Sequence, residues 1–306
     1  MKIAVMGSGG VGGFYGARLA KGGADVTFIA RGAHLEAMRA RGLRVESPLI
    51  GDFVLPEVKA TDDPASIGPV DVVLITVKSY ALTDAARAIV PLIGEHTVVI
   101  PLLNGVDIAE RINEIVGAGH LMGGVVYVLA AIAEPGVIRH FNADRLVFGE
   151  LDGGPSERGQ AIEAVMKAAG VPGEFSTDIQ KEIWNKFIFL SALAGITSVT
   201  RSPAGVVRED PDIRRLLIAC MQESVALSRE LGIAMEEEGW KKHLELIDSL
   251  PPQGKPSMLL DLEQGRKLEV EALNGTAARL GEKLGIPTPV NRFIYAVLKP
   301  HANGTP

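Results

Sequence analysis

Lys186 is the side chain in the C-terminal half whose surroundings best suit chemistry. It lies in the segment EIWNKFIFLSALAG, where apolar residues crowd it on both sides. A lysine can polarise a carbonyl oxygen and then protonate it, particularly where partial burial lowers the pKa of its amine. The simpler structural interpretation is an ion pair with Glu182, four residues earlier on the same helix and in the favourable order. The pattern alone therefore favours the structural role, with a catalytic role as the alternative.

Glu269 is a second candidate, in the segment PSMLLDLEQGRKLEVEALNG. This segment predicts one long helix over residues 257–284, with an apolar stripe along one face. Glu269 lies at the edge of that stripe, where a carboxylate can be partly buried beside a site. Ser257 follows Pro256 and is predicted to cap the start of the helix. Taken alone, both residues have structural roles as their simplest interpretation.

A glycine-rich motif opens the chain. The run Gly7, Ser8, Gly9, Gly10, Val11, Gly12 matches GxGxxG directly after an apolar segment and before a helical pattern. In a β–turn–α unit the first glycine permits the tight turn, the second lets backbone N–H groups approach a pyrophosphate, and the third lets the helix pack on the strand. The alternative is a turn that is merely rich in glycine. In this context we expect a dinucleotide-binding turn.

The choice of dinucleotide depends on the end of the second strand, where a carboxylate would bind the ribose 2′-OH of NAD. This chain has Arg31 there and no acid, and a guanidinium suits a 2′-phosphate. We therefore expect NADP(H), with a plain surface arginine as the alternative. Lys78 and Asn104 follow two further apolar runs, at the sheet edge where open α/β sheets bind ligands. A solvated strand end and an Asn-Gly turn are equally good interpretations of their positions alone.

These candidates need elements that position them. Short apolar runs alternate with helical patterns in the first half, which predicts a doubly wound, mostly parallel Rossmann sheet. The segment GDFVLPEVKATDD alternates and contains a proline, so we expect an edge hairpin there. Beyond residue 172 strand signals fade, and long helices are expected over 179–194, 213–231 and 257–284. We therefore expect a Rossmann domain over residues 1–172 and an all-helical domain over 173–306, which together form an α/β protein.

Composition narrows the classes of function. Hydrophobic residues make up 47% and charged residues 22%, as in a soluble globular protein, and the net charge of −6 argues against a nucleic-acid partner. The one cysteine, Cys220, lies in an apolar run, so we expect a buried thiol in a reducing cytoplasm. The sequence has no long uninterrupted apolar segment, so we expect no membrane association. The six histidines lack ligand spacing, so we expect no metal.

Several motifs follow one another in a set order between residue 1 and about residue 295: the glycine motif, Arg31, TVKSY with Lys78, LLNGV with Asn104, PGVIRH, EIWNKF with Lys186, and SMLLDLEQGRKLEVEALNG. In order and spacing the chain resembles the ketopantoate reductases, or 2-dehydropantoate 2-reductases. The resemblance implies a Rossmann domain joined to a helical domain, and the reduction of a 2-keto acid by NADPH. Its first candidate substrate is 2-dehydropantoate, which is reduced to pantoate in pantothenate and coenzyme A biosynthesis.

The resemblance also implies roles for individual residues. Lys186 matches the proton donor of the family, which also contacts the substrate, and Glu269 matches an acidic residue close to both cofactor and substrate. Ser257 matches a substrate-binding serine, and Asn104 an asparagine shared by cofactor and substrate. Lys78 matches a cofactor contact. Ala131 falls where a backbone contact to the cofactor is expected.

The chain also departs from the family pattern. Well-known members hold the carboxylate and hydroxyl of the substrate with asparagines that follow the lysine, and here the corresponding positions are Leu190, Ala194 and Ala204. Losing polar partners should change which substrate fits. A bulkier or more apolar 2-keto acid is therefore the alternative to ketopantoate.

Two other functions remain open at this point. A two-domain dehydrogenase of the 3-hydroxyacid or opine type shares the Rossmann start, but fits the EIWNK and GRKLEVE segments poorly. A non-catalytic NADP(H)-binding sensor would account for the lost asparagines but not for the retained Lys186 and Glu269. Helical second domains often pair through apolar faces, so we expect a homodimer.

Overall fold

The chain folds into two compact units. The structure is a computed structural model that describes residues 1–117 and 119–304. Unit 1 comprises Met1–Leu103 and Ile108–Ile179, and unit 2 comprises Asn104–Asp107 and Gln180–Pro306. From the sequence we expected the second domain to begin at residue 173, whereas in the structure the chain enters unit 2 after Ile179.

Unit 1 contains a sheet of five parallel strands. In spatial order they are β5 (Lys59–Thr61), β2 (Asp25–Ile29), β1 (Lys2–Met6), β6 (Val72–Ile75) and β7 (Val98–Pro101). Every residue of β6 and β7 is buried, as expected of parallel strands that are covered on both faces. The predicted doubly wound parallel sheet is confirmed.

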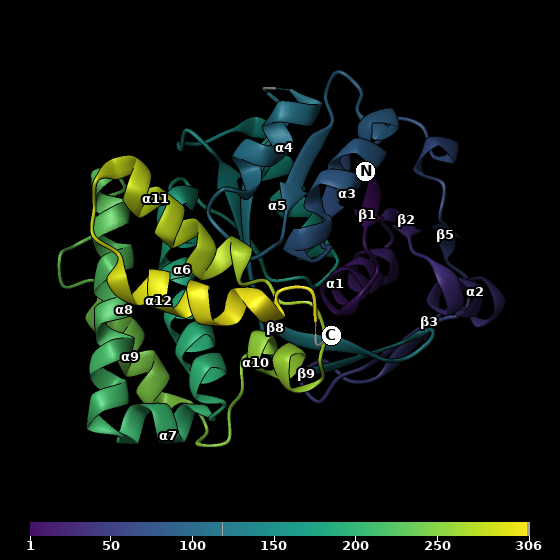
Figure 1. Cartoon of the computed structure of the whole chain (residues 1–306). Coiled ribbons are helices and arrows are strands. Elements are labelled where there is room, and N and C mark those ends of the chain that lie inside the picture. The colour runs from purple at the N-terminus through teal and green to yellow at the C-terminus, as the bar shows by residue number, and fades with distance from the viewer. Residues whose placement is uncertain (118, 305–306) are drawn as a thin grey trace. The chain divides into compact units, whose positions relative to one another are not determined.

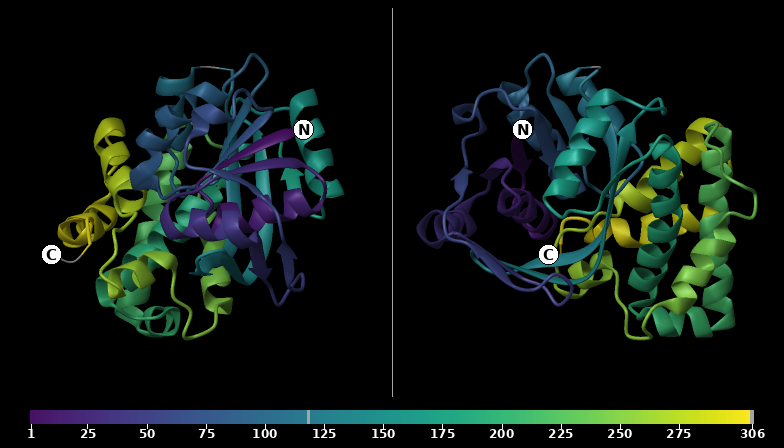
Figure 2. Two further views of the ribbon diagram at one scale, coloured as in Figure 1. Left: turned by 90° about the vertical axis from the view of Figure 1, so that its right-hand side faces the viewer. Right: turned by 180° about the vertical axis from the view of Figure 1, so that it is seen from behind.

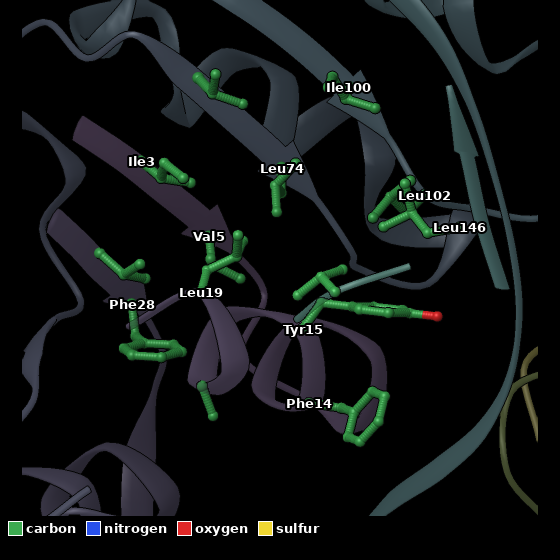
Figure 3. Packing of buried hydrophobic residues seen from close by; sticks show 14 of the residues in the cluster. Ile3, Val5, Phe14, Tyr15, Leu19, Phe28, Leu74, Ile100, Leu102 and Leu146 are labelled. Carbon is green, nitrogen blue, oxygen red and sulfur yellow. The ribbon is translucent and has the colours of Figure 1, made fainter. Parts of the chain in front are cut away.

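Helices flank this sheet and complete its core. They are α1 (Gly10–Lys21), α2 (Gly32–Arg41), α3 (Leu82–Ala88), α4 (Ile108–Val116) and α5 (Glu157–Ala168), with short 3-10 helices η1 (Pro64–Ser66), η2 (Ser79–Ala81) and η3 (Val90–Leu92). Figure 3 shows Tyr15 and Leu19 of α1 beside Val5 and Leu74 of the sheet. This packing fixes α1, and therefore the turn that precedes it, against the sheet.

A second sheet in unit 1 was not anticipated. Its order is β10 (Gly173–Phe175), β9 (Val137–Glu150), β3 (Leu43–Glu46) and β4 (Phe53–Leu55), and β8 (Met122–Glu134) pairs with β9 in a long antiparallel ribbon. The expected edge hairpin is wrong, because β4 pairs with β3 while β5 joins the parallel sheet beside β2. Pro56 lies between β4 and β5 and lacks the N–H that a continuous ladder needs.

Unit 2 is helical, as predicted. Its helices are α6 (Ile179–Thr200), α7 (Ala204–Glu209), α8 (Pro211–Glu230), α9 (Trp240–Ser249), α10 (Ser257–Glu263), α11 (Thr276–Leu284) and α12 (Pro289–Leu298), with a π-helix η4 (Glu271–Gly275) and a 3-10 helix η5 (Lys299–His301). The long helices α6 and α8 lie side by side in the views of Figures 1 and 2. Cys220 on α8 is fully buried, as expected, and burial raises the pKa of its thiol.

Helix α6 carries Lys186 and is long and apolar. By length and composition alone it is the one helix, among the residues described, that could cross a membrane. However, 61% of its apolar window is buried inside the structure. That burial is typical of a core helix, and α6 contributes Trp184, Phe187 and Ile188 to the core of unit 2.

The single helix predicted over residues 257–284 is wrong. Helix α10 ends at Glu263, because Gly265 adopts a left-handed conformation with φ of +64°. The amide of Gly265 donates to the Leu262 carbonyl and that of Arg266 to the Asp261 carbonyl, the paired bonds of a Schellman motif. Glu269 therefore lies in the segment between α10 and η4. The predicted cap is also wrong: Pro256 occupies the cap position, and Ser257 is the first helical residue.

Candidate functional site

The glycine turn between β1 and α1 is shaped by its neighbours. Gly7 has φ of +97°, a conformation that strongly favours glycine. The Thr76 hydroxyl donates to the Gly7 carbonyl at 2.5 Å, and the Ser8 hydroxyl donates to the Ile29 carbonyl at 3.2 Å. The turn is therefore fastened to the ends of β6 and β2. Thr76 went unnoticed in the sequence because an isolated threonine at a strand end carries no signal.

The ribbon of β8 and β9 also approaches this turn. A side chain on Gly10 would collide with the carbonyl of Ala130, and it would come within 2.9 Å of the amide nitrogen of Ala131. A side chain on Gly12 would likewise collide with the Gly7 carbonyl. Only glycine fits at these two positions. The structure thus brings the backbone of Ala131 beside the glycine turn, and its contact with a cofactor stays a prediction.

A cavity of about 280 Å³ opens beside the turn. Its lining includes Gly7, Ser8, Gly9, Arg31 and three residues that sequence analysis missed, namely His34, Asp84 and Ile132. Arg31 is exposed and immediately precedes α2. Lys78 is half-buried and immediately precedes η2. The one feature of the sequence that could have indicated a role for His34 is its position one helical turn after Arg31.

This region of unit 1 has the chemistry of an anion site. The first backbone N–H groups of α1 have no partner within the helix and carry the positive end of its dipole. The glycines leave room for a phosphate to approach them, and the guanidinium of Arg31 suits a second phosphate. The residues present therefore fit a phosphorylated dinucleotide.

Unit 2 brings three of the predicted residues together. Asn104 belongs to the short segment Asn104–Asp107, and its side-chain amide donates to Oε2 of Glu269 at 3.1 Å. The Glu269 side chain is buried, with 5% of the residue exposed. Glu269 also acts electrostatically on the amine of Lys186. Residues that are far apart in the sequence therefore form one polar group, called here the lysine cluster: Lys186, Glu269 and Asn104.

The environment of Lys186 changes its acidity. Burial lowers the pKa of its amine from 10.5 to about 8, and the carboxylate of Glu269 opposes part of that shift. An amine with this pKa is mostly protonated at neutral pH, yet it releases its proton far more readily than an exposed lysine. The lysine cluster can therefore place a positive charge and a transferable proton next to an oxygen atom.

The positions of the missing asparagines are apolar in the structure as well as in the sequence. Ala194 on α6 and Ala204 on α7 have no exposed surface and belong to the core of unit 2. Leu190, one helical turn after Lys186, is half-buried and packs against the same core. None of the three offers a polar group. Ser257 is half-buried at the start of α10.

Comparison with known families agrees with the fold and the motifs. The model "Ketopantoate reductase PanE/ApbA" matches residues 3–153, and "Ketopantoate reductase PanE/ApbA C terminal" matches residues 178–302. A 2-dehydropantoate 2-reductase of Mesorhizobium japonicum is 32% identical, with 98% of this chain and 97% of the relative covered.

Comparison with solved structures also finds 2-dehydropantoate 2-reductases. A 2-dehydropantoate 2-reductase from Geobacter metallireducens is 31% identical, with a TM-score of 0.92 over 98% of this chain and 99% of its own. A D-mandelate dehydrogenase solved with NADH and anilino(oxo)acetate is 21% identical, with a TM-score of 0.89 over 99% of this chain and 98% of its own. The first shares both sequence and fold with this chain, and the second shares the fold. The two family models together match most of the chain, and this protein belongs to the ketopantoate reductase family of oxidoreductases.

Proposed function

We propose that this chain reduces a 2-keto acid to the corresponding 2-hydroxy acid with NADPH. The best candidate for the substrate is 2-dehydropantoate, with pantoate as the product, as in pantothenate biosynthesis. The lysine cluster carries the proposal, because it combines a buried carboxylate with an amine whose pKa is lowered to about 8. The expected setting is a homodimer in the cytoplasm.

The coenzyme site of the proposal is the glycine turn of unit 1. Gly7, Ser8, Gly9, Gly10, Val11 and Gly12 hold the pyrophosphate through backbone N–H groups, and Arg31 holds the 2′-phosphate of NADPH. Lys78, Asn104, Glu269 and the backbone of Ala131 contribute the remaining contacts. Bound NADPH supplies the hydride. A preference for NADH is the alternative that Arg31 argues against.

The chain's own residues carry out the proton transfer. Ser257, Asn104 and Lys186 bind the 2-keto acid, and the ammonium of Lys186 polarises its carbonyl oxygen. As hydride adds to the carbonyl carbon, the oxygen gains negative charge and takes the proton from Nζ of Lys186. Glu269 stabilises the charged form of Lys186 before transfer and is itself held by Asn104.

The experiment that tests this proposal follows NADPH absorbance with a panel of 2-keto acids. We expect oxidation of NADPH with ketopantoate or with a more apolar 2-keto acid, and no comparable oxidation when Lys186 is replaced by alanine. Lack of oxidation with every member of the panel, together with intact NADPH binding, would favour a sensor and contradict the proposal.

A second substrate is favoured by the apolar positions of unit 2. Leu190, Ala194 and Ala204 offer no polar partner for the hydroxyl group of ketopantoate, so an apolar 2-keto acid is a good alternative. The fold is compatible with such a ligand, since the D-mandelate dehydrogenase was solved with anilino(oxo)acetate. The ratio of kcat/KM for ketopantoate and for an aromatic 2-keto acid separates the two substrates.

A further inference from the structure

His34 occupies an unusual position in unit 1. It lies in the first turn of α2 and lines the cavity beside the glycine turn. Its Nδ1 accepts a hydrogen bond from the backbone amide of Gly136 at 3.1 Å. Gly136 has φ of +83° and lies in the turn that joins β8 to β9. The ring therefore fastens α2 to the tip of the β8–β9 ribbon.

The other side of the ring points to the glycine turn. Because Nδ1 accepts the Gly136 amide, the neutral ring must carry its proton on Nε2. Nε2 is buried and has no partner at full hydrogen-bond geometry. The backbone of Ser8 raises the pKa of the His34 ring, which is the effect of a carbonyl acceptor close to a ring nitrogen. Ser8 is the second residue of the glycine turn.

We propose that His34, in its neutral form, is a positioning residue for dinucleotide binding that holds the β8–β9 turn at Gly136 beside the glycine turn at Ser8. This inference rests on the proposed dinucleotide site. Both segments line that site, because Ser8 and Ile132 of β8 border the cavity and Ala130 abuts Gly10. His34 acts on the turn that holds the pyrophosphate, which NAD and NADP share.

The bridge requires an uncharged ring. A protonated imidazole has hydrogen on both nitrogens and cannot accept the Gly136 amide. Burial lowers the pKa of His34 below 6.5, with the Ser8 backbone opposing the shift, so the ring is neutral at neutral pH. Charged side chains around it include Arg31 and Asp84, which line the same cavity, and Arg41 on α2, which donates to the Pro135 carbonyl.

The test measures binding of NAD⁺ and NADP⁺ by calorimetry to the wild type and matched variants. We expect H34A to weaken both coenzymes by the same factor, about tenfold. R31A should weaken NADP⁺ alone. E36A, at an exposed position of α2, should change neither. Melting temperatures of the variants show whether a loss of binding reflects unfolding.

The pH dependence supplies the second readout. Between pH 8 and 7 the affinity of the wild type for NAD⁺ should be constant, and below pH 6.5 it should fall as His34 becomes charged. NAD⁺ is used because it lacks a 2′-phosphate that would titrate in this range. H34N, whose side-chain oxygen can accept the Gly136 amide but does not titrate, should show no such fall.

Several outcomes would overturn the inference. Unchanged affinity of H34A for both coenzymes, or a loss for NADP⁺ alone, would contradict a role on the shared pyrophosphate. An identical pH dependence in the wild type and H34N would contradict the requirement for a neutral ring. If the wild type bound neither coenzyme, the proposed function itself would fail. If R31A weakened NADP⁺ selectively while H34A bound both coenzymes like the wild type, only the role of His34 would be rejected.

Discussion

The glycine turn of unit 1 and the lysine cluster of unit 2 are built in opposite ways. The turn is made of backbone, from six consecutive residues of which four are glycines, whose missing side chains create the space for a phosphate. The cluster is made of side chains from three distant parts of the sequence, Asn104, Lys186 and Glu269. The turn binds through geometry, whereas the cluster depends on the burial that changes the pKa of Lys186.

This difference predicts how each region responds to mutation. A change in the glycine turn or its surroundings should alter coenzyme affinity and leave the acidity of Lys186 alone. A change of Lys186 in the lysine cluster should alter turnover and its pH dependence, and leave coenzyme affinity nearly intact.

The largest effect is expected for Lys186→Ala. Without the amine no group of the cluster protonates the carbonyl oxygen, so kcat should fall by about 10² or more. The dissociation constant of NADPH, measured by fluorescence titration, should remain nearly the same. Lys186→Arg is the matched control, since a guanidinium keeps the charge but does not release a proton near neutral pH. Turnover that survived the alanine change would remove Lys186 from the mechanism.

Arg31→Ala should have the largest effect on the unit 1 side. Loss of a charge-assisted contact to the 2′-phosphate should weaken NADPH by about 10- to 100-fold and leave NADH nearly unchanged. Arg39→Ala serves as the control, because it removes an exposed positive charge from α2, the helix that Arg31 precedes, and Arg39 does not border the cavity. Equal losses in both arginine variants would mean that general electrostatics, and not a 2′-phosphate contact, explains the effect.

Leu190→Asn tests substrate choice in unit 2. A side-chain amide one helical turn after Lys186 should shift the ratio of kcat/KM toward ketopantoate and away from an aromatic 2-keto acid, by about tenfold. Steady-state kinetics with both substrates gives this ratio. If the two values of kcat/KM changed in parallel, the side chain of Leu190 would have no part in selecting the substrate.

The smallest effect is expected for Gly265→Ala. Its φ of +64° is costly for alanine, so the free energy of unfolding should fall by about 1 kcal/mol, seen as a lower midpoint in chemical denaturation. Gln264→Ala, at the adjacent exposed position with an ordinary φ of −94°, is the control. An unchanged midpoint for the glycine variant would argue against the Schellman end of α10.

The contrast between the two regions also explains what could be predicted from sequence. The glycine turn was predictable because its glycines, the apolar strand before them and the helix after them are contiguous in the sequence, and they are observed as β1, the turn and α1. The long helix over 257–284 failed because a single left-handed glycine outweighs an apolar stripe that continues beyond it. The expected hairpin failed because local alternation does not reveal which sheet a strand joins.

The lysine cluster could be anticipated only through the resemblance to a family. Asn104 and Glu269 are 165 residues apart, and no local pattern predicts that they share a hydrogen bond. Pattern alone favoured an ion pair with Glu182 for Lys186, whereas the structure adds the effect of Glu269. His34 was missed for a similar reason, since its partner Gly136 is 102 residues away.

The most direct test of the account is the pH dependence of kcat/KM for 2-keto acid reduction. The acid form of Lys186 donates the proton, so activity should be high below pH 8 and decline above it. In Glu269→Gln the carboxylate that raises the pKa of Lys186 is gone, so the decline should begin at lower pH. A wild-type profile that stays flat to pH 10, or a decline that moves to higher pH in the variant, would contradict the central role of the Lys186 amine beside Glu269.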